Sequence, residues 1–145
     1  MSEERSMEAR NKAGQYFKDG HNCAEAIFLA FKDEFDLDEN LVKMFTGFGR
    51  GVGEAGCMCG ALTGCIGVLS MITGRTTTDN EERDQCYAYT KEFHDRFKEQ
   101  FSITCCRALN PYDFSTRDHA VCCLKITGKT GKLFMEFLQE KGLVK

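Results

Sequence analysis

The sequence has little proline and no excess of charge of either sign. It contains one proline, no tryptophan, and 19 basic against 22 acidic residues, for a formal net charge of −3. Without a basic excess or a block of like charges, the chain lacks the electrostatic features of a nucleic-acid-binding protein. Its 145 residues, 42% of them hydrophobic, are enough to bury a core. We therefore expect one globular domain that does not bind nucleic acid.

The beginning of the chain lacks the pattern of a targeting signal. Residues 1–17 include Glu3, Glu4 and Glu8 and contain no apolar stretch, unlike a secretory signal or a transit peptide. We therefore expect a cytoplasmic protein. In a reducing compartment, nine cysteines are better explained as metal ligands, redox thiols or buried small residues than as permanent disulfides.

One uncharged stretch raises the question of a membrane. Residues 55–74 contain no charged side chain, and Gly56, Gly60 and Gly64 form two overlapping G-x-x-x-G units. The stretch is long enough to span a bilayer. It is also rich in glycine and hydroxyl groups, and the amphipathic segments around it need an apolar partner. We expect a buried central helix and no membrane insertion.

Helical periodicity runs through nearly the whole chain. Apolar residues recur every three or four positions, and no segment alternates with period two for long enough to be a strand. The predicted helices cover residues 7–19, 23–35, a segment capped by Asp38, 57–73, 79–101, 105–109 and 118–141, the last with a potential interruption at 128–131. The pattern predicts an all-α fold, a compact bundle of five to seven helices around a central Gly-rich apolar helix.

The cysteines are the residues most informative about chemistry. They are Cys23, Cys57, Cys59, Cys65, Cys86 and the adjacent pairs Cys105/Cys106 and Cys122/Cys123. Several follow predicted helix starts, where free N–H groups and the helix dipole stabilise a thiolate and lower the pKa of a cysteine. Thiolate is the form that exchanges disulfides and binds metals. On apolar helix faces, by contrast, we expect Cys65 and Cys86 to fill the core.

The segment at residues 59–64 reads C-G-A-L-T-G. With the spaced cysteines, it resembles the C_GCAxxG_C_C family, whose members are described as redox-active and have four signature cysteines. The resemblance extends from N-C-A-E-A at residues 22–26 through G-F-G-R-G-V-G at 47–53 to the last helix. It implies that residues 1–145 form a single helical domain of this type with a redox role.

The resemblance also implies which cysteines act together. The implied site residues are Cys23, Cys59, Cys106 and Cys123. The third signature cysteine is followed in the family by a basic residue and then a leucine, which fits Cys106 better than Cys105. The fourth precedes a short apolar turn, which fits Cys123. The alternates are Cys57, Cys105 and Cys122.

The sequence leaves three uses of these cysteines open. In the first, the thiols cycle between thiols and one or two disulfides, as in a thiol-based oxidoreductase, with Cys59 as nucleophile and Cys57 or Cys23 as the resolving thiol. In the second, the four thiolates bind an iron–sulfur cluster or zinc. In the third, the protein is a non-catalytic helical interaction module. The redox partner stays unknown, and a homodimer is the simplest assembly to expect.

Overall fold

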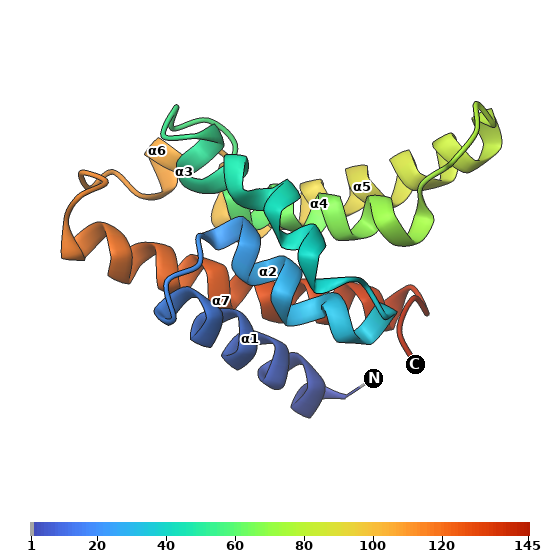
Figure 1. Ribbon diagram of the computed structural model, residues 1–145, viewed down its shortest axis with the longest axis horizontal. Helices are drawn as coiled ribbons and strands as arrows, with labels where there is room; N and C mark the ends of the chain where they lie inside the picture. Colours follow the sequence, from blue (N-terminus) through green and yellow to red (C-terminus); the bar gives the residue numbers. More distant parts are fainter. Residues whose placement is uncertain (1) are drawn as a thin grey trace.

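The computed structural model describes residues 2–145, which are helical along most of their length (Figure 1). The α-helices are α1 (Glu3–Lys18), α2 (Cys23–Phe31), α3 (Gly49–Val52), α4 (Gly60–Thr73), α5 (Asn80–Phe101), α6 (Cys106–Leu109) and α7 (Arg117–Glu140). Two 3₁₀ helices, η1 (Lys32–Phe35) and η2 (Glu39–Phe48), lie between α2 and α3. No strand occurs within residues 2–145. The predicted all-α fold of five to seven helices is therefore confirmed.

The long pairing of α1 with α7 explains why the last helix is continuous. Helix α7 passes through Gly128 and Gly131, where the sequence predicted a potential interruption. Helix α7 runs alongside α1 (Figure 1), and both glycines face it. A Cβ on Gly131 would come within 3.1 Å of Ala13 Cβ and of the Ala9 carbonyl oxygen. The glycines therefore allow two helices to approach closely instead of ending one of them.

Helix α4 begins three residues later than the predicted segment 57–73, because residues 57–59 are extended. The Cys59 N–H donates to the Thr104 carbonyl oxygen at 2.8 Å, and the Cys106 N–H donates to the Cys57 carbonyl oxygen at 2.5 Å. These bonds flank an isolated antiparallel bridge between Met58 and Cys105. This pairing ties the start of α4 to the start of α6.

The segment after Asp38 also differs from the prediction, since it is 3₁₀ rather than α-helical. The Asp38 side chain does cap it by accepting from the Asn40 N–H at 2.9 Å. Val42, Thr46 and Gly47 have low α-helix propensity, which favours the tighter and weaker helix here.

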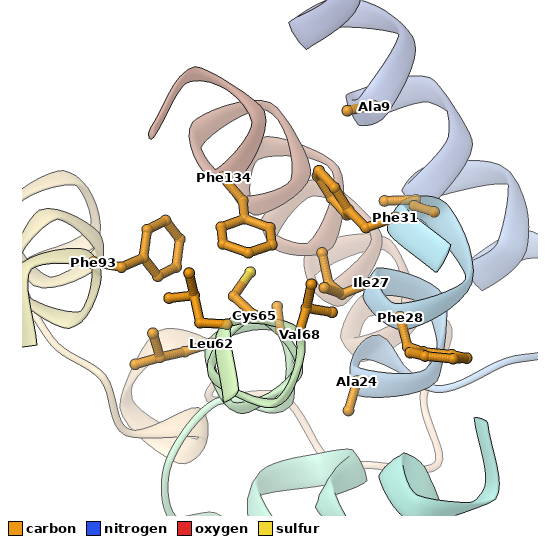
Figure 2. Packing of buried hydrophobic residues seen from close by; sticks show 14 of the residues in the cluster. Ala9, Ala24, Ile27, Phe28, Phe31, Leu62, Cys65, Val68, Phe93 and Phe134 are labelled. Atoms are coloured by element: carbon orange, nitrogen blue, oxygen red, sulfur yellow. The ribbon is translucent and has the colours of Figure 1, made fainter. Parts of the chain in front are cut away.

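The core lies where α2, α4, α5 and α7 meet (Figure 2). Phe31 and Phe93 both pack edge to face against Phe134, with ring centroids 4.8 and 5.0 Å apart. Leu62 and Cys65 of α4 are fully buried beside them. Helix α4 is thus the buried apolar helix that the sequence predicted.

None of the helices formed by residues 2–145 combines the length and apolar character that a bilayer crossing needs.

Candidate thiol site

The structure brings together the four cysteines that the family resemblance implied. Cys23 begins α2, Cys59 directly precedes α4, Cys106 begins α6, and Cys123 lies near the start of α7. Each of these side chains is close enough to another of the four to change its pKa. We call this group of four the thiol site.

Glycines provide the room for the thiol site. A Cβ on Gly60, the residue after Cys59, would lie 2.4 Å from Cys23 Sγ. A Cβ on Gly51 would lie 2.7 Å from Cys106 Cβ, and Gly51 also has a positive φ of 67°. Larger residues at these two positions would push the cysteines apart. The glycine that follows the cysteine of the C-G-A-x-x-G motif therefore has a direct structural role.

Cys23 and Cys123 are the most strongly interacting pair of the site. Hydrogen bonding from the Cys123 thiol lowers the pKa of Cys23; burial opposes this, and backbone N–H groups at Arg50 and Ala24 add to it. Hydrogen bonding to Cys23, together with burial, raises the pKa of Cys123. Cys23 is therefore the first of the pair to ionise, while Cys123 keeps its proton as a donor.

Cys59 and Cys106 behave differently, although they also lie at helix starts. Burial, with a further contribution from the charge on Cys23, raises the pKa of Cys59 and raises that of Cys106 to about 11. At Cys59 the N–H groups of Ala61 and Leu62 act in the opposite direction but do not compensate for burial. The sequence favoured Cys59 as the nucleophile, whereas the electrostatics of the structure favour Cys23.

The alternate cysteines lie around the site or away from it. Cys57 is exposed, the Cys105 thiol donates to the Gly56 carbonyl oxygen at 2.9 Å, and the Cys122 thiol lies 3.7 Å from the Leu109 carbonyl oxygen. Cys65 and Cys86 are buried in α4 and α5, as their positions on apolar faces predicted. All nine cysteines are free thiols.

A pocket of about 240 Å³ opens beside Cys23 and Cys123. Its walls include Arg50 and His119. The His119 side chain is buried, its Nε2 has no hydrogen-bond partner, and burial and the Arg50 charge lower its pKa, so it is neutral at pH 7. Sequence reasoning missed His119 because no ligand-like spacing connects it to a cysteine.

The four thiols are suitable metal ligands by their chemistry, but their positions in the structure do not form a metal site. Four cysteines are the usual ligand set of iron–sulfur clusters and of many structural zinc sites. Across residues 2–145, however, no three His, Cys, Asp or Glu side chains are arranged as a set of metal ligands. The residues that would hold such a group are Cys23, Cys59, Cys106 and Cys123.

By its fold and site, the chain falls in the class of small all-α proteins with clustered cysteines. Within this class, the chain belongs to the C_GCAxxG_C_C family: the family model, described as "Putative redox-active protein (C_GCAxxG_C_C)", matches residues 21–137, which include the whole thiol site. The chain is also similar to an uncharacterized protein of Archaeoglobus fulgidus, with 24% identity over 148 residues that cover 95% of this chain and 98% of the relative. No solved structure matches it.

Proposed function

We propose that the protein is a thiol-based redox protein in which Cys23 and Cys123 cycle between two thiols and one disulfide. The observation that supports this most directly is the pairing of a thiol of lowered pKa, Cys23, with a protonated partner that hydrogen-bonds to it. A thiolate beside a second thiol is the arrangement that disulfide exchange requires. The family description as redox-active agrees with this function.

The exchange needs only these two cysteines and a substrate disulfide. The Cys23 thiolate attacks one substrate sulfur, so that a mixed disulfide forms and the first substrate thiolate leaves. That thiolate accepts the proton of Cys123. The Cys123 thiolate then attacks Cys23 Sγ, and the second substrate thiolate leaves. The second substrate thiolate takes from water the proton that Cys23 released when it ionised. The protein has thus lost two electrons and two protons, and the substrate disulfide has become two thiols.

Cys59 and Cys106 provide a second pair of thiols next to the first. Both interact electrostatically with Cys23, and both have a raised pKa, which keeps them protonated at neutral pH. In the proposed cycle they remain thiols while Cys23 and Cys123 are oxidised. A second disulfide between them would form under more oxidising conditions.

A redox titration tests the proposal. The reduced protein is equilibrated in glutathione buffers of rising potential, free thiols are counted, and linked peptides are mapped by mass spectrometry. We expect the count to fall from nine to seven and the first link to join Cys23 to Cys123. Cys23→Ser abolishes this link, whereas the control Cys86→Ser, which alters a buried cysteine of α5, retains it. Nine free thiols at every potential would overturn the proposal.

A metal centre is the second candidate function, because each of the four cysteines, which lie at or near helix starts, interacts electrostatically with at least one of the others. In this case the same four cysteines hold an iron–sulfur cluster or zinc. Metal analysis and an absorption spectrum of protein purified without oxygen distinguish the two. Stoichiometric iron with visible charge-transfer bands, or stoichiometric zinc without colour, would favour the metal centre. Protein without metal and without disulfide would leave a helical interaction module.

A further inference from the structure

The pocket beside Cys23 and Cys123 gives a route to two thiols that are otherwise enclosed. These two are the cysteines that line it, whereas Cys59 and Cys106 do not. Cys23 is only 4% exposed. A disulfide on the surface of a folded protein cannot reach so buried a sulfur unless the helices move, but a small molecule that enters about 240 Å³ can. The shape of the site therefore favours a small substrate.

Arg50 contributes a positive charge to the pocket wall, and its backbone lies next to Cys23. Arg50 has a positive φ of 54°, a strained conformation for a residue with a side chain, and its backbone N–H helps to lower the pKa of the nearby Cys23 thiol. Its guanidinium group lies 5.6 Å from the centroid of the Phe114 ring, in a cation–π contact. Arg50 also forms an ion pair with Glu54 at 2.5 Å, with both side chains about half exposed. Such an exposed ion pair is weak. The carboxylate of a ligand can therefore replace Glu54 as the partner of Arg50 at little cost in free energy.

The same wall contains a polar atom that lacks a partner. His119 Nε2 is buried and unpaired, next to Phe114, whose ring is 5.1 Å from the imidazole ring. An unpaired buried nitrogen is unfavourable. Because Nε2 has almost no accessible surface, a ligand in the pocket pairs with it only after the imidazole ring turns toward the pocket. The nearby carboxylate of Asp113 does not pair with His119 Nε2, because it accepts hydrogen bonds from the backbone N–H and the hydroxyl group of Ser115.

We propose that this pocket binds a low-molecular-weight disulfide that carries a carboxylate, with the carboxylate at Arg50 and His119 and the disulfide beside Cys23. The Arg50 guanidinium group is suited to a carboxylate because it offers two parallel N–H donors. Cys23 and Cys123 then reduce the bound disulfide to two thiols and become linked themselves, by the exchange written above. The inference rests on the proposed redox function and adds the class of its substrate.

The test compares three small disulfides that differ in charge: 3,3′-dithiodipropionate, 2-hydroxyethyl disulfide and cystamine. The rate at which each one links Cys23 to Cys123 is divided by its rate with a small free thiol, which corrects for intrinsic reactivity. We expect the anionic reagent to be about 10-fold faster than the cationic one, which is the effect of one partly exposed charge pair.

Variants show whether Arg50 causes this selectivity. Arg50→Gln should reduce the ratio of anionic to cationic rates to near 1, Arg50→Lys should restore part of it, and the control Arg83→Gln on α5 should leave it unchanged. His119→Phe should lower the ratio to a lesser extent. Circular dichroism confirms that each variant is folded.

The outcomes separate this inference from the proposed function. Equal corrected rates for all three reagents, or a preference that survives Arg50→Gln, would overturn the substrate class while leaving the redox function intact. If no reagent links Cys23 to Cys123, the redox function itself fails.

Discussion

Cys23 and Cys65 are both buried cysteines, yet their surroundings give them opposite properties. Cys65 lies in the core with no exposed surface, and burial raises its pKa well above the usual value. Cys23 is 4% exposed, but hydrogen bonding from Cys123 and from backbone N–H groups lowers its pKa despite burial. The comparison shows that hydrogen-bond donors can lower the pKa of a buried thiol, whereas burial without donors raises it.

The largest expected effect comes from closing the space that Cys23 occupies. In Gly60→Ala the added Cβ would lie 2.4 Å from Cys23 Sγ and 2.7 Å from the Phe48 carbonyl oxygen. We expect the free energy of unfolding to fall by about 2 kcal/mol or more, because neither α2 nor the backbone at Phe48 can yield cheaply. Urea unfolding measures the loss. The matched control is Gly47→Ala, where nothing lies within 4 Å of the new Cβ; equal losses in both variants would contradict the steric account.

The second prediction concerns stability at high pH. Burial raises the pKa of Cys65, so above about pH 9 the unfolded chain releases this proton while the folded chain retains it. The folded state is thereby destabilised as the pH rises, by up to ~1.4 kcal/mol per pH unit for such a thiol. Cys23 acts in the opposite sense: its pKa is lower in the folded state, so its contribution is present at high pH and is lost as the pH falls through the folded pKa.

Measuring the free energy of unfolding between pH 8 and 10.5 checks how the protonation of Cys65 affects stability. Cys65→Ala should give a shallower loss of stability with rising pH than the wild type, whatever its stability at neutral pH. Parallel curves for the two proteins would show that Cys65 does not hold its proton as described.

The third prediction concerns the lowered pKa that distinguishes Cys23 from Cys65. Cys123→Ala removes the hydrogen bond that is the main cause of the lowered pKa of Cys23, so that this pKa should rise. Cys123→Ser keeps an O–H donor at the same place and should preserve more of the lowering. The rate of alkylation of Cys23 as a function of pH reports both. The same pH profile in the wild type and in Cys123→Ala would remove the physical basis of the pair.

The smallest effect is expected at the exposed Cys57. Cys57→Ser should change the free energy of unfolding by less than about 0.5 kcal/mol, as surface substitutions generally do. It should also leave the Cys23–Cys123 disulfide unaffected, since Cys123 is the partner of Cys23 in the proposed cycle. A lower yield of that disulfide in peptide mapping would instead identify Cys57 as a resolving thiol.

Much of the fold could be predicted because its signal is local. The apolar periodicity and the capping side chains set the starts of α2 and α5. The Asn22 side chain accepts from the Glu25 N–H, and the Asp79 side chain accepts from the N–H groups of Glu81 and Glu82. The extended residues 57–59 could not be predicted, because their hydrogen bonds go to residues 104–106, more than 40 positions away. The unbroken path of α7 through Gly131 likewise depends on α1 as its neighbour.

The site was less accessible to sequence reasoning than the fold. The family resemblance indicated the four cysteines, but the electrostatic order among them depends on which side chain donates to which. Cys23 lies in α2 and Cys123 in α7, 100 positions apart in the sequence. No local pattern in the sequence could therefore indicate that they pair. Arg50 lies within the G-F-G-R-G-V-G segment at residues 47–53, but nothing in the sequence places it beside Cys23. His119 had no signal, since a histidine with no companion motif is most often a structural residue.

The most direct test of the central claim is the rate at which each cysteine of the fully reduced protein reacts with iodoacetamide at pH 7, resolved by peptide mass spectrometry. We expect Cys23 to react well ahead of Cys59 and Cys65, although all three are almost completely buried. If Cys23 reacts as slowly as Cys65, burial alone governs these thiols, and Cys23 is not the nucleophile.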